Sequence, residues 1–287
     1  MAHHPAHWPQ DHDDDPPIGV SIRPLRLDQL PEPTLPPPPI VGEPERGGAY
    51  GEPGASALVC YRRHRTAEWA RFLRSMPWRL AAVVAAGGLT GTLAQGLGPR
   101  VAGPAAAVAA GGVGWLLRFR VSADTAAWRR GARGERRTAR ALRPLLRVGW
   151  TVLHDVAIPD SRANADHVLI GPPGVFLVDT KAWHGHITMA ADGSAWHNGH
   201  PMDGALDTVR WEADQLAAAL GAPVLPLLCV HDARLPWDEL YVAGEPIVPV
   251  LTPARLMATL RTLPAHLDQV GVMLLAEHIR HQLHPAT

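Results

Sequence analysis

Lysine is almost absent from this chain of 287 residues. Of its 27 basic side chains, 26 are arginine, and the one lysine is Lys181. Either residue can solvate a surface, but lysine presents a compact ammonium on a flexible stem, whereas arginine presents a planar fork. The one exception therefore indicates a position at which an ammonium is needed. The alternative is chance, since a single lysine must fall somewhere.

Cysteine is also rare, and several catalytic motifs are missing. Cys60 and Cys229 lie far apart in unlike contexts, so the sequence indicates neither a disulfide framework nor a metal-thiolate site, which fits a reducing compartment. No glycine-rich loop for ATP hydrolysis and no motif with a nucleophilic serine or cysteine is present. The first residues hold His and Asp where a signal peptide has a basic and then an apolar region, so we expect no signal peptide.

Charge is unevenly spread along the chain, although the net charge is zero. Residues 1–57 hold nine acidic and three basic side chains together with 13 prolines. Such a segment cannot bury enough apolar surface to offset the entropy of ordering it. We therefore predict a disordered, acidic, locally polyproline II tail, whose proline run at 36–39 is a candidate docking motif for a protein partner.

Residues 58–122 combine a basic helix, predicted to end near Pro77, with two stretches that lack charge. These stretches, 80–98 and 101–117, are rich in Ala, Gly and Val, and each approaches the ~20 residues that span a bilayer as a helix. Because arginines flank the pair on both outer sides, the positive-inside rule predicts a hairpin in the cell membrane, with the tail and the C-terminal domain in the cytoplasm. The alternative is a soluble helical hairpin in a cytoplasmic protein, because Ala and Gly drive membrane insertion only weakly.

Residues 123–287 alternate between helical and strand patterns. The order of these elements is typical of an α/β domain with a mixed sheet flanked by helices. Helices are predicted over 123–147, 206–220, 252–263 and 269–283, and strands over 150–156, 168–170, 175–178, 186–190, 195–197, 224–230 and within 240–250.

Charged residues gather on the predicted hairpin that turns at 171–174. Asp166 precedes its first strand, and Asp179 and Lys181 end its second. Because side chains alternate between the faces of a strand, Asp179 and Lys181 point the same way. Two carboxylates are enough to hold Mg²⁺, which keeps several waters, polarises a phosphoryl oxygen and acidifies a bound water. The lysine can then orient that water or neutralise developing charge; the alternative is a surface salt bridge between Asp179 and Lys181.

Other polar residues are weaker candidates. Glu135, the one acid amid the arginines of 129–147, either pairs with an arginine or points toward Asp166. Those arginines suit a nucleic-acid backbone or anionic lipid headgroups equally well. His167 alternates away from Asp166 and is expected to be structural. Four further side chains near the site, and one on the next helix, are candidates for metal, phosphate, base or supporting contacts: His184, His186, Trp183, Trp196 and Gln215. For the two tryptophans, core packing is the favoured alternative to stacking on bases.

The succession of motifs over residues 130 to 230 resembles the nuclease-related domain, NERD. The resemblance lies in Gly134-Glu135, in 152–156, in the Asp166-His167-Val168 strand and in 174–181, which ends in acid-x-Lys. It implies a restriction-endonuclease-like fold of the PD-(D/E)xK superfamily, with Glu135, Asp166, Asp179 and Lys181 at the motif positions. The family more often has Glu where this chain has Asp179, and the shorter side chain alters where a metal would sit.

Together these observations predict a metal-dependent phosphodiesterase that acts on DNA or RNA with Mg²⁺ or Mn²⁺ held by Asp166 and Asp179, tethered to a membrane through residues 80–117. Two alternatives remain open. One is a catalytically inactive nuclease fold that binds nucleic acid or protein. The other is a membrane scaffold whose tail recruits partners through its proline run.

Overall fold

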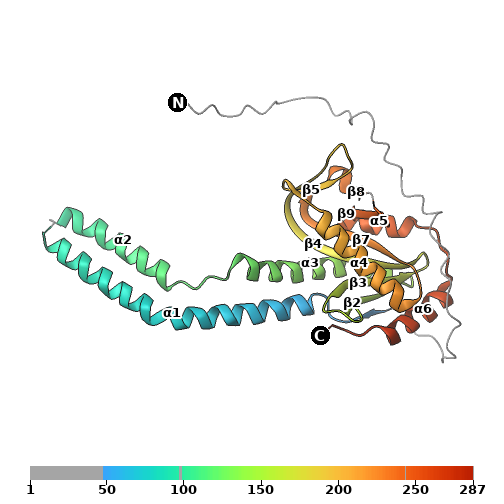
Figure 1. Ribbon diagram of the computed structural model, residues 1–287, viewed down its shortest axis with the longest axis horizontal. Coiled ribbons are helices and arrows are strands. Elements are labelled where there is room, and N and C mark those ends of the chain that lie inside the picture. The colour runs from blue at the N-terminus through green and yellow to red at the C-terminus, as the bar shows by residue number, and fades with distance from the viewer. Residues whose placement is uncertain (1–47, 97–98, 243, 287) are drawn as a thin grey trace.

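The computed structural model describes residues 48–96, 99–242 and 244–286, which form an α/β domain and a long helical arm (Figure 1). The predicted disordered tail of residues 1–57 thus lies mostly outside the described residues. Its end is described, and there the prediction is wrong. β1 (Ala49–Tyr50) pairs in parallel with β2 (Thr151–Ala157), and α1 (Ala55–Gly96) also begins within the predicted tail. The guanidinium of Arg280 lies 3.8 Å from the centroid of the Tyr50 ring and so holds this short strand against the domain.

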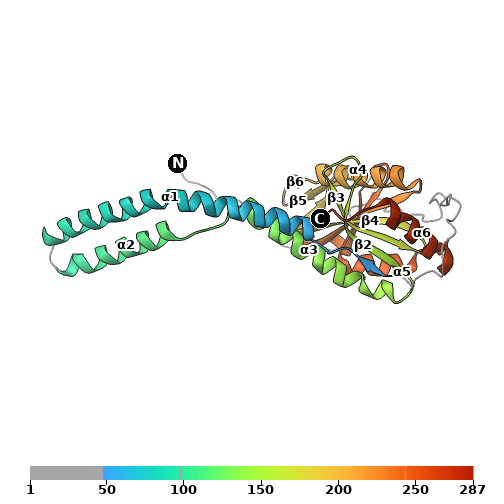
Figure 2. The same ribbon diagram turned by 90° about the horizontal axis from the view of Figure 1, so that it is seen from below.

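The domain is built on a mixed sheet with strand order β1-β2-β3-β4-β7-β9-β8. Pairing is antiparallel from β2 to β4 and between β8 and β9, and parallel where β4 meets β7 and β7 meets β9. Helices α3 and α5 cover one face, and α4 and α6 cover the other (Figures 1 and 2). The predicted mixed sheet flanked by helices is confirmed.

The predicted helices are all present, whereas β3 and β7 are longer than predicted, the predicted strands 175–178 and 186–190 form one continuous strand, β4, and β6 and a short 3-10 helix were not predicted. The elements of the domain are α3 (Ala123–Leu146), β3 (Asn164–Gly171), β4 (Gly174–Met189), β5 (Ala195–His197), β6 (His200–Pro201), α4 (Asp203–Leu220), β7 (Val224–Arg234), the short 3-10 helix η2 (Pro236–Asp238), β8 (Glu239–Val242), β9 (Val248–Leu251), α5 (Pro253–Thr262) and α6 (Gln269–Gln282). The far end of β4 leaves the main sheet and pairs with β5, which gives the second predicted hairpin. Thr252 caps α5 through its side chain, as its position before Pro253 predicts.

The alternation of β4 divides the core into two layers. Phe176 and Val178 pack on one face with Leu142 of α3, whereas Leu177 packs on the other with Leu216 of α4. All five side chains are at most 2% exposed. Each contributes about 1.5–3 kcal/mol by leaving water, so both helical layers are fixed against the strand that carries Asp179 and Lys181.

The arm consists of α1 and α2 (Pro99–Leu117), which run side by side away from the domain (Figures 1 and 2). The first half of α1 packs on α3, and its second half packs on α2. A helical hairpin was predicted here, but α1 does not end near Pro77 and passes through it. A proline inside a helix removes one backbone hydrogen bond. Packing on both sides of the proline offsets that loss, which sequence periodicity does not show.

Within the described residues, no helix combines the length and the apolarity needed to cross a membrane. The prediction that 80–98 and 101–117 span the bilayer is therefore not supported. Its weakness lies in the Ala and Gly that dominate both stretches, since these residues add far less apolar surface than Leu, Ile or Phe.

Candidate active site

Strand β4 presents Asp179 and Lys181 on the face of the sheet that α4 covers. Lys181 Nζ lies 2.8 Å from Asp179 Oδ2 and donates a hydrogen bond of 3.1 Å to Oδ1. Thr180, between them, faces α3 and donates to Thr138 at 3.0 Å. The alternation predicted from the sequence therefore holds, and an ammonium and a carboxylate share one face.

Asp166 lies where β3 separates from β4. The last ladder pair on this side joins His167 to Val178. Beyond it, Asp166 Oδ2 accepts a hydrogen bond of 2.8 Å from the backbone N–H of Thr180. The Asp166 carboxylate thus accepts a hydrogen bond from the Thr180 N–H, which the backbone of β3 no longer reaches at this point. This contact places the second carboxylate against the backbone between Asp179 and Lys181, as the predicted site requires.

Glu135 enters the site from α3, which approaches the sheet closely at Gly134. A Cβ atom at Gly134 would lie 3.0 Å from Ala182 Cβ and 3.2 Å from Thr180 Cγ2, so a larger residue would push the helix away. Glu135 is 5% exposed, and its Oε2 has no hydrogen-bond partner among the described residues. Burial, followed by the charges of Asp155 and Asp179, raises the pKa of Glu135 to about 7.

The three acids and the lysine influence one another electrostatically. Burial, and then the carboxylates of Glu135 and Asp179, raise the pKa of Asp166 well above its usual value. Burial disfavours the charged form of Lys181, but Asp179 and Asp166 outweigh it and raise the lysine pKa. The structure therefore brings all four predicted site residues into one interacting cluster, with Lys181 charged across the physiological range.

A fifth member of this cluster, Glu212 on α4, is absent from the sequence-based predictions. It is 7% exposed, and its Oε2 lacks a hydrogen-bond partner in the described part of the chain. Burial and then Asp179 raise the pKa of Glu212 to about 8, and Lys181 opposes the shift. A signal existed: Val209 and Leu216 are buried on the same helix face, and residue 212 shares their helical spacing.

The cluster fits a bound divalent cation by its chemistry. Four carboxyl groups face a single ammonium, and burial or mutual repulsion raises the pKa of three of them: Glu135, Asp166 and Glu212. In residues 48–96, 99–242 and 244–286, no three or more His, Cys, Asp or Glu side chains are arranged to hold a metal ion. Mg²⁺ needs only one or two carboxylates, because water fills its other positions. Asp166 and Asp179 are the residues that would hold it.

The histidines near the site are placed differently from the acids. His167 is fully buried, with its Nδ1 2.8 Å from His154 Nδ1, on the α3 face. Burial lowers the pKa of both rings, that of His154 to about 4. This agrees with the structural role predicted for His167. The candidates His184 and His186 are exposed, and His184 interacts with Asp232 rather than with the cluster.

Three other candidates also lie apart from the cluster. Trp183 stacks on His197, with ring centroids 4.6 Å apart, and packs against the core. Trp196 donates its ring N–H to Ser194 at 2.9 Å. Gln215 is partly buried, and within the described residues its side chain makes no hydrogen bond. Core packing therefore accounts for Trp183 better than base stacking does.

Comparison with known proteins bears on the region that contains the whole cluster. Residues 130–233 match the family model described as the nuclease-related domain, NERD. This range begins within α3 and ends in β7, so it covers all five clustered residues. Neither the curated proteins nor the solved structures gave a match to the chain.

Proposed function

Because residues 130–233 match the nuclease-related domain, we propose that this chain is a metal-dependent phosphodiesterase that cleaves DNA or RNA. The observation that carries the proposal is the convergence of Asp166, Asp179 and the only lysine of the chain at one end of the β3–β4 ladder. The three layers of helix, sheet and helix support a restriction-endonuclease-like fold for the same region.

In this proposal, Asp166 and Asp179 are the residues that hold Mg²⁺ or Mn²⁺. Such an ion supplies a Lewis acid for a phosphoryl oxygen and a more acidic bound water. Asp166 is fixed by the Thr180 N–H, and Asp179 by the Lys181 ammonium, so both carboxylates are oriented by contacts of the chain itself. The reaction is hydrolysis: a water oxygen bonds to phosphorus, and the bond to the leaving sugar oxygen breaks.

Lys181 is proposed to stabilise the extra negative charge that develops on the phosphoryl oxygens. It carries its proton at neutral pH because the surrounding carboxylates raise its pKa. Its side chain is 26% exposed, so it is reachable from solvent, whereas that of Asp179 is only 9% exposed. A preoriented cation of this kind typically contributes ~100-fold or more to the rate.

Glu135 is proposed to accept a proton from the attacking water. A general base works best when its pKa is close to the working pH. Burial and the charges of Asp155 and Asp179 raise the pKa of Glu135 to about 7, and its Oε2 has no partner in the described residues. Both facts support this role, which the resemblance alone leaves unspecified.

A nuclease fold that binds nucleic acid without cutting it is the second candidate. The observation that favours it is the contact of 2.8 Å between Lys181 and Asp179, which engages one of the two carboxylates that a metal would need. This candidate predicts binding that does not require Mg²⁺ and weakens with salt, with no turnover.

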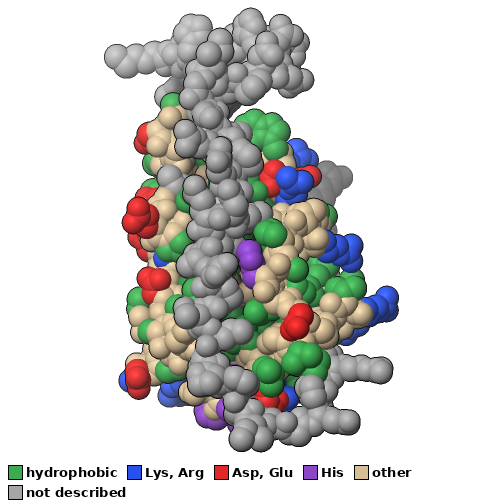
Figure 3. All heavy atoms as spheres, turned by 90° about the vertical axis from the view of Figure 1, so that its right-hand side faces the viewer, with side chains coloured by type: hydrophobic (Ala, Val, Ile, Leu, Met, Phe, Trp, Pro, Cys, Tyr) green, Lys and Arg blue, Asp and Glu red, His purple; other side chains and the backbone are tan. Residues whose placement is uncertain are grey.

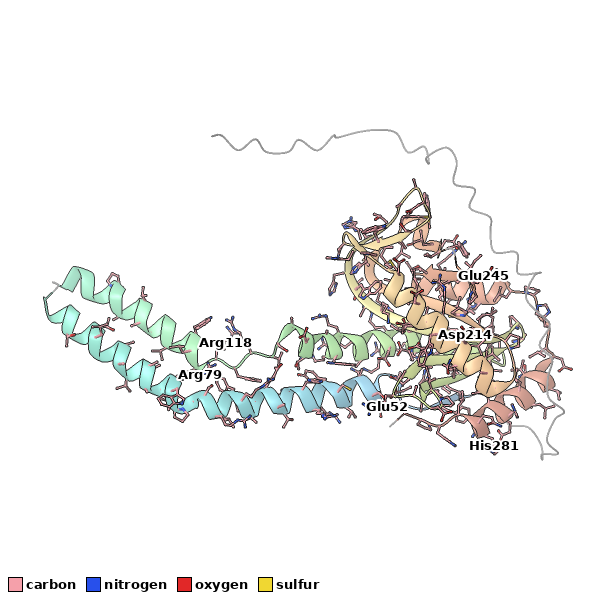
Figure 4. The ribbon with its side chains drawn as sticks, in the orientation of Figure 1. Glu52, Arg79, Arg118, Asp214, Glu245 and His281 are labelled. Carbon is pink, nitrogen blue, oxygen red and sulfur yellow. The ribbon has the colours of Figure 1, made fainter. Side chains whose placement is uncertain are left out.

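The full chain should be assayed on single- and double-stranded DNA and RNA with Mg²⁺, with Mn²⁺ and with EDTA. We expect cleavage of at least one substrate, loss of cleavage in EDTA, and a fall of at least about 100-fold in the Asp179→Asn variant. Asp214→Asn is the matched control, because Asp214 is an exposed acid on α4 (Figure 4). Binding without turnover under every condition would select the second candidate.

A further inference from the structure

A cavity of about 750 Å³ lies in the arm, where the segment that links α2 to α3 passes beside α1. Its walls come from the middle of α1, the end of α2 and residues 118–122. Arg79 and Arg118 mark the place in Figure 4. The cavity is remote from β4 and its acids, and the nuclease proposal does not use it.

The cavity is strongly cationic. Arg71, Arg79, Arg118 and Arg120 line it, against one acid, Glu68. None of these four arginines forms a salt bridge with a carboxylate of the described residues. Glu68 is already engaged, since Ser122 and Thr125 donate to its carboxylate, and these hydrogen bonds lower its pKa. Four guanidinium groups therefore share one carboxylate, whose charge acts on Arg71, and the remaining excess of positive charge suits an anion.

Arg79 is held in place before any ligand binds. Its Nε donates to Ser75 Oγ at 2.8 Å, its Nη1 donates to the carbonyl of Leu116, and its guanidinium lies 4.8 Å from the centroid of the Phe72 ring. These contacts fix one cation at the junction of α1 and α2. A fixed guanidinium loses little freedom when it binds phosphate oxygens, which match its planar fork.

The cavity wall also carries apolar side chains, and further apolar side chains of the arm are exposed. Trp115 and Phe119 belong to the cavity wall, and Trp115 is 65% exposed. Farther along the arm, Val84 is 73% and Val108 is 77% exposed, and Trp78, next to Pro77 in α1, is 80% exposed. The end of the domain that faces away from the arm shows hydrophobic side chains intermixed with charged ones of both signs (Figure 3).

We propose that this cavity binds the phosphate headgroup of an anionic phospholipid, whose acyl chains contact the exposed apolar side chains of α1 and α2. The arginines match the phosphate, and tryptophans beside an apolar surface are typical of the boundary between headgroups and acyl chains. A nucleic acid would use the arginines but would leave Val84 and Val108 in water. Such a contact requires no helix to cross the bilayer, so it agrees with the lengths and apolarity of the helices.

The test is sedimentation of the full chain with vesicles of phosphatidylcholine, with and without phosphatidylglycerol. We expect binding to the anionic vesicles and a loss of roughly 30-fold in affinity for Arg118→Ala/Arg120→Ala, since each basic residue at a membrane surface contributes about fivefold. Both arginines are exposed, so the variant should fold, and its thermal unfolding checks this.

The matched control is Arg62→Ala/Arg63→Ala, which removes the same charge from exposed positions of α1. Along the helix, these positions lie about 12 Å from Arg71, the nearest cavity arginine, and about 24 Å from Arg79, beyond the ~8 Å over which salt screens charge. We expect their affinity to stay within about twofold of the parent. A second variant, Trp115→Ser, should weaken binding without changing charge.

Soluble competitors distinguish a lipid headgroup from free phosphate as the ligand of the cavity. Soluble dihexanoylphosphatidylglycerol should displace the chain from vesicles, and inorganic phosphate at the same concentration should not. Equal losses of vesicle affinity in the two double arginine variants would overturn the proposal. Equal binding of the parent to neutral and anionic vesicles would overturn it as well. Displacement by inorganic phosphate would assign a free-phosphate site instead. A duplex oligonucleotide that competes fully, and whose own binding depends on Arg118 and Arg120, would assign the cavity to nucleic acid.

Discussion

The α/β domain and the helical arm place the same residue types in opposite environments. In the domain, Trp150 is 4% exposed, whereas Trp78 in the arm is 80% exposed. Glutamates show the same contrast. Glu135 is buried and its pKa is raised to about 7, whereas Glu68 in the arm has a lowered pKa because Ser122 and Thr125 donate hydrogen bonds to it.

This difference indicates what each part is built to do. Acids in a folded core cost free energy unless something compensates them, so Glu135 and Glu212 are difficult to explain by stability alone. Apolar side chains left in water bring no stability to their own fold. The domain therefore gives up stability to bury acidic side chains, and the arm leaves apolar side chains on its surface. Buried acids and exposed apolar side chains are both typical of sites that bind a second molecule.

The largest expected effect on stability separates the two parts directly. Phe176→Ala should lower the free energy of unfolding by about 3–5 kcal/mol, because it leaves a cavity beside Trp150 and Leu142. Val84→Ala in the arm should change it by less than about 0.5 kcal/mol. Chemical denaturation of both variants measures the contrast. Equal losses would mean that the apolar surface of the arm is buried in solution.

A smaller effect on stability is expected from Glu212, the acid that the sequence-based predictions missed. Glu212 binds its proton more tightly in the folded chain, with a pKa of about 8 against an ordinary 4.5. Its contribution to stability is therefore greatest below pH 4.5 and is lost as the pH rises from there to about 8.

Glu212→Gln should remove part of this pH dependence. Between pH 5 and 8, the free energy of unfolding should fall less in the variant than in the parent, by at least about 1 kcal/mol. Urea denaturation in EDTA across this range measures it, with Asp214→Asn as the control. Parallel pH curves for parent and Glu212→Gln would show that Glu212 is not buried as an acid.

Much of the domain followed from local patterns. Alternation placed Asp179 and Lys181 on one face, helical spacing placed α4, and the Thr252-Pro253 pair marked the start of α5. These features depend on interactions between residues that are close in the chain, and such residues can be recognised in a single sequence. The acid, acid and lysine positions were predictable for the same reason, because strand ends and turns locate them.

Features that depend on distant contacts were missed. β1 forms because it pairs with β2 and because its Tyr50 ring contacts the guanidinium of Arg280. Both partners lie about a hundred or more residues away along the chain. The passage of α1 through Pro77 depends on packing against α2 and α3. Glu212 belongs to the site only because α4 crosses the face that carries Asp179. The membrane-spanning prediction relied on the absence of charge, which is a poorer guide than apolar surface.

The most direct test of the central claim, that the cluster is a hydrolytic site, concerns the only lysine. Single-turnover cleavage with Mg²⁺ should be compared for the parent, Lys181→Met and Lys181→Arg. We predict a fall of at least about 100-fold for Met, and a large fall for Arg as well, because a planar guanidinium cannot take the place of the ammonium beside Asp179. Cleavage at the parent rate in Lys181→Met would contradict the account.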